Sequence, residues 1–300
     1  MNTSVKTEEW KKDLRKNFII GMIGNSQEKD IAAEQVGYCY TCYAPNYLYK
    51  YYSDNPERLE TIKSNKMWYS APCKFNDVFD CDISIDEKGV FNSFLKSIPD
   101  KRGIKPGSSM WLKIKKEVHS GISSLYDFFE GLKKSMGISC FSESPDSLLM
   151  WAHYANNHRG ICVEYELLEI SNMLNFSPVP VIYDNEKTSF NYLNENTIDS
   201  DSTRVFVESI TSKSPEWSYE KEWRIIRDEG ACGSNWDTKN NGALLEMIRP
   251  HSIILGCQAE QDYEKLVHKY CEENRINLYK MKKDPQLYKL IKTPILTYDE

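Results

Sequence analysis

The sequence lacks the short motifs by which many enzymes are recognised. It contains no Gly-x-Gly-x-x-Gly loop, no Walker-type phosphate loop, no Gly-x-Ser-x-Gly elbow and no His-Glu-x-x-His pair. These absences exclude the usual sequence signatures of nucleotide-binding loops, serine hydrolases and zinc proteases. Any catalytic function must therefore depend on a less familiar set of residues.

Long apolar runs and a positive net charge are also missing. No apolar stretch approaches the ~20 residues of a membrane span, and no apolar segment follows a basic start at the N-terminus, so we expect neither a span nor a signal peptide. The formal net charge of −6 argues against capture of nucleic acid or acidic membranes by charge alone. We expect a cytoplasmic protein without a membrane partner.

The cysteines do not form a recognisable framework. There are nine of them, an odd number scattered along the chain, which fits a reducing compartment better than a set of disulfides. Cys39 and Cys42 form a single Cys-x-x-Cys without a second pair at metal-ligand spacing. The sequence therefore predicts free thiols and no metal site.

Aromatic residues are abundant. Nineteen tyrosines and seven tryptophans stand in a chain of 300 residues. Such side chains bury area while keeping a polar group, so they suit the walls of a ligand site, and core packing is the alternative explanation for any one of them. The length allows one large domain or two small ones.

The hydrophobic periodicity predicts helices at the N-terminus and then a mixture of strands and helices. Apolar residues recur at helical spacing over residues 7–20, and a second helix is expected over residues 27–36. Strands are expected over residues 47–52 and 66–70, with a helix beginning at Asn55 and Pro56 between them. We divide the chain into a helical N-terminal extension, residues 1–46, which could bind a partner protein, and one α+β domain, residues 47–300.

Further elements follow the same reasoning. Helices are expected around Phe91–Leu95, Met110–Val118 and Ile122–Leu132 and over residues 260–274. A strand is expected over residues 136–142, a helix beginning at Ser144 and Pro145, and a strand after Gly160. Gly160 is expected to relieve a backbone constraint at the entry to that strand rather than to contact phosphate. Residues 179–183 predict an edge strand, residues 184–203 a surface loop, and residues 223–226 and 253–255 two more strands. The short strands favour a largely antiparallel sheet with flanking helices.

Two glutamates near the last third of the chain could carry chemistry. Glu220 and Glu222 stand two residues apart, so a strand would point both to one face together with Arg224. Paired carboxylates can orient a sugar hydroxyl or stabilise an oxocarbenium-like centre. The alternative is a surface strand with a simple Glu–Arg ion pair.

Other polar residues carry weaker signals. Asn76, Asp77, Asp80 and Asp82 could bind Mg²⁺ or Ca²⁺, although their spacing is not that of an EF-hand, and an Asx-capped turn is the alternative. His153 lies on a short helix with apolar neighbours and could be a core histidine or a base.

Read in order, several segments resemble a large bacterial family, the domain of unknown function 2971. They are Leu48-Tyr49-Lys50-Tyr51, Phe75-Asn76-Asp77-Val78-Phe79-Asp80, Cys140-Phe141-Ser142, Leu149-Met150-Trp151-Ala152-His153-Tyr154, and Tyr219-Glu220-Lys221-Glu222-Trp223-Arg224. The resemblance covers residues 47–260. Val78 stands where the family motif has proline.

That family in turn is similar to the ADP-ribosyltransferase superfamily. The resemblance implies a split antiparallel sheet that binds NAD, with Lys50 on the first strand, Ser70 on the second and Glu222 on a later one. It also implies a cofactor-binding role for a wider set of side chains, with Glu222 and Glu220 as catalytic residues. That set is Lys50, Tyr51, Ser70, Asn76, His153, Tyr154 and Arg224. Lys50 departs from the usual arginine or histidine and lacks a planar fork of donors.

The leading expectation is an NAD-using, ADP-ribosyltransferase-like enzyme whose acceptor is a protein, a nucleic acid or water. Such enzymes often act as toxins or antiphage effectors. A non-catalytic ligand- or partner-binding domain is the first alternative. A metal-dependent nuclease using Asp77, Asp80, Asp82 and the late glutamates is the second.

Overall fold

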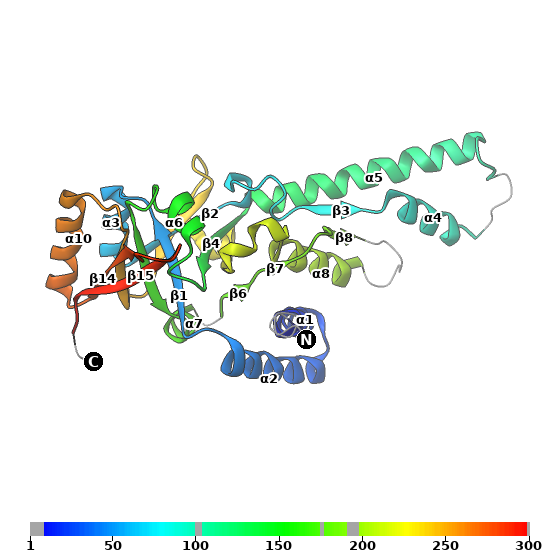
Figure 1. The fold of residues 1–300 in the computed structure, drawn as a ribbon. Helices are drawn as coiled ribbons and strands as arrows, with labels where there is room; N and C mark the ends of the chain where they lie inside the picture. Colours follow the sequence, from blue (N-terminus) through cyan, green and yellow to red (C-terminus); the bar gives the residue numbers. More distant parts are fainter. Residues whose placement is uncertain (1–8, 100–103, 175–176, 191–197, 299–300) are drawn as a thin grey trace. The chain divides into compact units, whose positions relative to one another are not determined.

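The computed structural model describes residues 9–99, 104–174, 177–190 and 198–298. The chain divides into two compact units, each made of three segments (Figure 1). Unit 1 contains residues 1–42, 72–135 and 182–214, and unit 2 contains residues 43–71, 136–181 and 215–300. Each unit has a hydrophobic core of its own.

Unit 1 is mainly helical. Its elements are α1 (Glu9–Ile23), α2 (Ser26–Tyr43), η1 (Pro72–Lys74), β3 (Ile83–Ile85), α4 (Glu87–Ser97), α5 (Ser109–Lys134), β7 (Ile182–Tyr183), β8 (Thr188–Phe190), α8 (Ile198–Ile210) and β9 (Ser212–Lys213). Two short parallel ladders, β3 with β8 and β7 with β9, join segments that are far apart in the sequence. The core beneath them contains Ile83, Ile122, Phe129, Phe190 and Val205.

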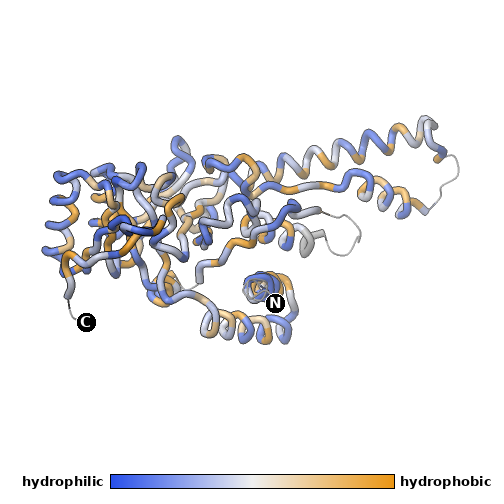
Figure 2. The backbone as a smooth tube through the Cα atoms, in the orientation of Figure 1, coloured by the Kyte–Doolittle hydropathy of each residue, from blue (hydrophilic) through white to orange (hydrophobic). Residues whose placement is uncertain are grey.

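Helix α5 is longer than the sequence suggested. Two helices were expected here, around Met110–Val118 and Ile122–Leu132, but α5 runs without a break through Gly121. A glycine inside a helix costs only about 1 kcal/mol relative to alanine, so the apolar residues on both sides outweigh it. Figure 2 shows apolar and polar residues alternating along α5, as expected for a helix that buries one side.

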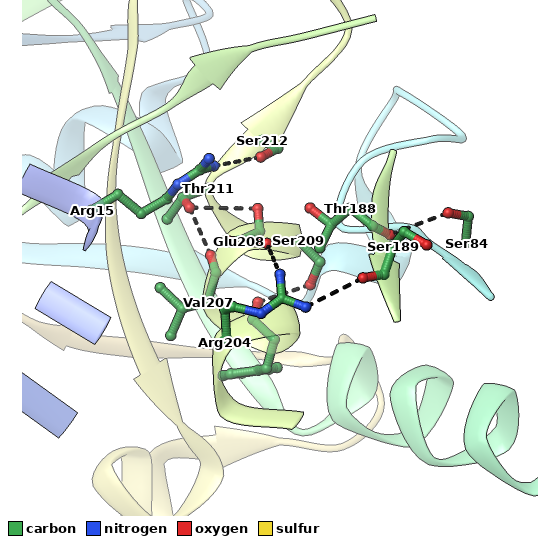
Figure 3. A network of polar contacts seen from close by, with 11 residues as sticks. Arg15, Ser84, Thr188, Ser189, Arg204, Val207, Glu208, Ser209, Thr211 and Ser212 are labelled. Carbon is green, nitrogen blue, oxygen red and sulfur yellow. Dashed lines mark hydrogen bonds and ion pairs between the residues drawn. The ribbon is translucent and has the colours of Figure 1, made fainter. Parts of the chain in front are cut away.

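Polar contacts fasten the elements of unit 1 to one another. The guanidinium of Arg15 on α1 donates to Ser212 at 2.7 Å (Figure 3). Arg204 on α8 pairs with Glu208 at 2.7 Å and donates to the carbonyl of Ser189. Contacts of this kind attach α1 to the later segments of the unit.

Unit 2 is built on one large sheet. Its strands are β1 (Tyr47–Tyr52), β2 (Lys66–Ser70), β4 (Met136–Ser142), β5 (Ile161–Glu166), β6 (Val179–Pro180), β10 (Glu222–Asp228), β11 (Trp236–Asp237), β12 (Gly242–Glu246), β13 (Ser252–Leu255), β14 (Asn277–Lys283) and β15 (Leu290–Leu296). Its helices are α3 (Pro56–Lys63), α6 (Leu148–Tyr154), α7 (Leu167–Leu174), η2 (Pro215–Glu220), α9 (Glu229–Cys232), η3 (Gly233–Asn235) and α10 (Gln261–Asn274).

The sheet is antiparallel in all but one of its described pairings. The strands follow the order β11-β12-β2-β4-β1-β5-β13-β14-β15, and β10 pairs with β4 and β6. Only β13 and β14 run parallel, joined by the crossover helix α10. The expected α+β class with a largely antiparallel sheet and flanking helices is confirmed at this level. The ADP-ribosyltransferase-like version of that fold stays a prediction.

The sheet forks at β4. Strand β10 occupies one edge of β4 along its whole length, so β1 and β2 must share the other edge. Strand β1 meets that edge at Ser142, and β2 meets it at Ile138. Cys140 lies between these two points, where the strands diverge.

Local signals predicted many elements well and a few wrongly. Asn55 caps α3 by accepting from the backbone N–H of Glu57, as its place before Pro56 suggested. Helix α6 begins later than expected, because the cap is Ser147 and not Ser144. The expected strand over residues 179–183 is two short strands in different sheets, β6 and β7. The expected loop over residues 184–203 contains β8 and the start of α8. Residues 191–197 of that loop lie outside the described residues.

The expected boundary after residue 46 is close to the first boundary between the units, after Cys42. Residues 47–300, however, contribute to both units, and the N-terminal helices belong to unit 1. A compact unit is not by itself an independently folding domain. The two-part division made from the sequence therefore stays a prediction. Among the described helices, none combines the length and the apolarity needed to cross a membrane.

Candidate functional site

One face of the unit 2 sheet carries a row of polar side chains. Residues directly opposite one another in a ladder point to the same face. The register places Glu222 opposite Ser142, Ser142 opposite Tyr49, Tyr49 opposite Glu164, and Glu164 opposite Ser252. We call this side the glutamate face. The row crosses five strands, and its members stand at five separate places in the sequence between residues 49 and 252.

Glu222 begins β10 and is almost fully buried. Arg224, two residues on and fully buried, donates from Nε to Glu222 Oε1 at 2.8 Å and from Nη2 to Oε2 at 3.0 Å. The expected partnership of Glu222 and Arg224 is thus present. Burial of such a pair is costly unless its geometry is good, and here two well-formed bonds offset the cost.

Glu220 reaches the same face by a route that differs from the expected one. It ends the 3-10 helix η2 and is not part of a strand. Lys221 adopts a left-handed backbone conformation, φ 45°, which turns the chain into β10. The buried carboxylate of Glu220 accepts a 2.6 Å hydrogen bond from the hydroxyl of Tyr154. The turn, and not strand alternation, brings the two glutamates together.

Helix α6 covers part of the glutamate face. The ring of Tyr51 on β1 meets Trp151 edge to face at 5.2 Å, and the indole of Trp151 donates to the carbonyl of Pro145. This packing fixes α6 and thereby places Tyr154 beside Glu220. His153 is exposed, with its ring 6.1 Å from that of Tyr219. Tyr51 packs in the hydrophobic core on this face, and its hydroxyl donates to the carbonyl of Ser144.

Ser70 also lies on the glutamate face. It stands opposite Ile138, which is an even number of residues from Ser142 along β4. Ser70 is partly buried and directly faces Gly242 on its other side. The structure therefore brings together the following predicted residues: Tyr51, Ser70, Tyr154, Glu220, Glu222 and Arg224.

Lys50 is not among them. It follows Tyr49 on β1, so its side chain points to the opposite face, where its ammonium lies 5.2 Å from the ring centre of Phe141. Its Nζ donates at 2.8 Å to the carbonyl of Cys140, at the fork in the sheet. Burial lowers the pKa of Lys50 to about 8. Lys50 thus satisfies a backbone group at the place where β1 and β2 separate.

Asn76 belongs to unit 1, whereas the other predicted residues belong to unit 2, and its side chain is exposed. In the same loop, Asp80 forms a buried 3.4 Å ion pair with Lys213, and Asp82 pairs with Lys187 at 2.6 Å. The Asp77 carboxylate accepts from the backbone N–H of Phe79, as in an Asx turn. Within the described ranges no three Asp, Glu, His or Cys side chains are grouped as metal ligands.

Glu164 is a member of the row that the sequence analysis missed. Its Oε2 accepts from Ser252 at 2.5 Å and from Lys292 at 2.8 Å, while its Oε1 accepts from the hydroxyl of Tyr49 at 3.2 Å. Burial alone would raise the pKa of Glu164, but the bonds from Lys292 and Ser252 outweigh it and hold the pKa low. A single glutamate inside the apolar run of residues 161–165 was the available signal.

Part of the chain that forms this site matches a known protein family. Residues 150–225 match the family described as a protein of unknown function, DUF2971. The match confirms the family resemblance drawn from the motifs. A comparison with curated proteins and another with solved structures each found no similar protein. No match bears on the similarity to ADP-ribosyltransferases, which stays a prediction.

The DUF2971 match begins inside α6 and ends inside β10. It therefore includes Tyr154, Glu164, Glu220, Glu222 and Arg224. The β1 and β2 residues of the glutamate face precede it. The matched segment is the part of the chain that supplies every buried carboxylate of this site.

Proposed function

We propose that unit 2 uses NAD as a substrate and transfers or hydrolyses its ADP-ribose group. The observation that carries the proposal is the buried pair of carboxylates, Glu220 and Glu222, at the beginning of β10. When nicotinamide leaves NAD, positive charge develops on the ribose. Carboxylates fixed in a desolvated setting stabilise such charge better than solvated ones.

The two glutamates would take different parts. Glu222 would face the developing oxocarbenium, and Glu220 would orient the acceptor, whether a macromolecule or water. Tyr154 is a neutral donor to Glu220, so it fixes the carboxylate without cancelling its charge. Ser70 shares this face, whereas Lys50 points away from it. A role for Lys50 in holding NAD stays a prediction.

A second candidate, a ligand-binding domain without catalysis, also has an observation in its favour. Both carboxylate oxygens of Glu222 are bonded to Arg224, which offsets the charge that catalysis would need. Such a domain would bind NAD, or a related compound, without cleaving it. The same experiment separates the two candidates.

The test is nicotinamide release together with a thermal-shift titration by NAD. We expect wild-type protein to be stabilised by NAD and to release nicotinamide, and Glu220→Gln to lower release at least tenfold, because an amide carries no charge. Glu216→Gln is the matched control, since Glu216 lies on η2 but is exposed. Release unchanged in Glu220→Gln would contradict the assignment of that residue.

Glu222 requires a paired design, because Glu222→Gln alone leaves the Arg224 charge buried and unpaired, at a cost of about 3–5 kcal/mol. The double variant Glu222→Gln with Arg224→Gln removes both charges and should fold. Loss of release in the double variant, with a normal unfolding transition, supports the enzyme. Stabilisation by NAD without release in wild type favours the binding domain, and no response to NAD contradicts both.

A further inference from the structure

The hydrogen bonds around Glu164 are arranged in a way that the proposed function does not use. Lys292 and Ser252 both donate to Oε2 of Glu164, which leaves Oε1 to Tyr49. Lys292 comes from β15, Ser252 from β13 and Tyr49 from β1, so three strands meet at one carboxylate. The carboxylate of Glu164 can only accept hydrogen bonds, so each of these three groups must donate to it.

This order fixes the direction of the Tyr49 hydrogen bond. A tyrosine hydroxyl has one proton, and in this structure that proton goes to Glu164. Burial, and then the negative charge of Glu164, raise the pKa of Tyr49, so the proton stays on the phenol at neutral pH. The phenolic oxygen can therefore offer only lone pairs to a ligand.

Tyr49 also has the right place to meet a ligand of this site. It is partly buried, and it stands directly opposite Ser142, which stands directly opposite Glu222. Ser142 itself is fully engaged, since its hydroxyl donates to the carbonyl of Glu220 and accepts from the backbone N–H of Ser144. Tyr49 is the next side chain along the row that a ligand near Glu222 would reach.

We infer that Glu164, held by Ser252 and Lys292, is a positioning residue that sets Tyr49 as a hydrogen-bond acceptor for a ribose hydroxyl next to the reacting centre. The inference rests on the proposed use of NAD. A hydroxyl-bearing sugar donates to such an acceptor, whereas a sugar without hydroxyls leaves the lone pairs of the phenol oxygen without a donor.

The experiment compares the dissociation constants of NAD and of an NAD analogue whose nicotinamide sugar lacks its 2′ and 3′ hydroxyls. Wild type should prefer NAD, and Tyr49→Phe should reduce that preference roughly three- to tenfold, the range of one net hydrogen bond. Tyr52→Phe is the matched control, because Tyr52 is on the same strand but faces the other side of the sheet.

Glu164→Gln gives the sharper result, since it keeps Tyr49 in place. The amide oxygen should turn toward Lys292 and Ser252, which both need an acceptor, and the amide nitrogen would then face Tyr49. Tyr49 would accept from the amide and present its proton to the ligand. Because a ribose hydroxyl can accept as well as donate, Glu164→Gln should keep its preference for NAD over this analogue, but it should gain affinity for a second analogue whose 2′ and 3′ oxygens are methyl ethers, which accept and cannot donate.

The outcomes are distinct. The inference is overturned if Tyr49→Phe keeps the full preference, if Glu164→Gln gains no affinity for the methyl ether analogue relative to wild type, or if wild type binds NAD and the analogue without hydroxyls equally. Binding with the expected pattern but no nicotinamide release would refute the proposed enzyme and leave the inference standing. If wild type binds neither compound, both fail. Unfolding curves of every variant show whether a loss comes from the site or from the fold.

Discussion

Lys50 shows how one position along a strand decides the role of a residue. Its motif suggested a group that holds NAD, and strand alternation places it on the face that carries Phe141, although the charge of Glu222 still acts on its ammonium and opposes the larger effect of burial on its pKa. There its ammonium bonds the Cys140 carbonyl, a backbone group at the fork of the sheet. An unbonded buried carbonyl would be costly, so Lys50 contributes to the shape of the sheet.

The lowered pKa of Lys50 predicts a dependence of stability on pH. Its pKa is about 8 in the folded protein and 10.5 as the ordinary value, which we take for the unfolded chain. Between these values the unfolded chain holds a proton that the folded protein has lost, so stability due to this group rises with pH. The unfolding free energy of wild type relative to Lys50→Met should therefore increase from pH 7 to pH 10.

Urea unfolding of both proteins across this pH range measures the effect. The comparison with Lys50→Met removes the contributions of tyrosines and cysteines, which titrate in the same range in both proteins. Lys282→Met is the control, because Lys282 lies on β14 and is exposed. Parallel curves for wild type and Lys50→Met would show that the Lys50 ammonium is not desolvated.

At the scale of elements, the turn before β10 is the feature that forms the site. Lys221 has φ 45°, its N–H donates to the carbonyl of Ser218, and its own carbonyl accepts from Glu143. These bonds hold a lysine in a conformation that usually favours glycine. Periodicity could not show this turn, since the alternation of Glu220, Glu222 and Arg224 is that of a continuous strand.

Substitutions at Lys221 should separate backbone strain from side-chain effects. Lys221→Gly should be as stable as wild type or up to about 1 kcal/mol more stable, because relief of strain offsets the entropy of glycine in the unfolded chain. Lys221→Ile should be less stable by about 1–2 kcal/mol, since a β-branched side chain suits this conformation poorly. Equal stability of both in urea unfolding would contradict the turn.

Gly160 illustrates a second constraint at this scale. A Cβ at this position would lie 2.0 Å from the carbonyl oxygen of Tyr52, so the entry to β5 requires glycine for close approach. The place of this glycine before a predicted strand indicated the same constraint. Close packing of neighbouring strands explains why glycine stands here, and contact with a phosphate is not needed to explain it.

At the scale of the whole molecule, the structure predicts which thiols react. All nine cysteines are free, and Cys42 and Cys73 are the two exposed ones. A thiol reagent should label these two quickly under native conditions and all nine after unfolding. The variant with Cys42→Ser and Cys73→Ser should lose the fast phase. A fast phase of more than two thiols in wild type, or one that survives in the variant, would contradict the described burial.

The order of the segments is another property of the whole chain. Each unit is assembled from three stretches of sequence, so the chain leaves and re-enters unit 2 twice. The sequence predicted a boundary after residue 46, and the first boundary between the units follows Cys42. That prediction could not indicate that residues 72–135 and 182–214 return to the N-terminal helices, because pairings such as β3 with β8 join distant segments.

The sequence by itself indicated the family resemblance, the free thiols as an expectation, the capped helix α3 and the strands β1, β2, β4 and β10, because motifs, caps, turns and apolar periodicity are local properties. Only the tertiary structure decided which side chains share a face. The row from Glu222 to Ser252 depends on the register of strands far apart in the chain. A shift of one residue would exchange Tyr49 for Lys50, and no local pattern fixes that register.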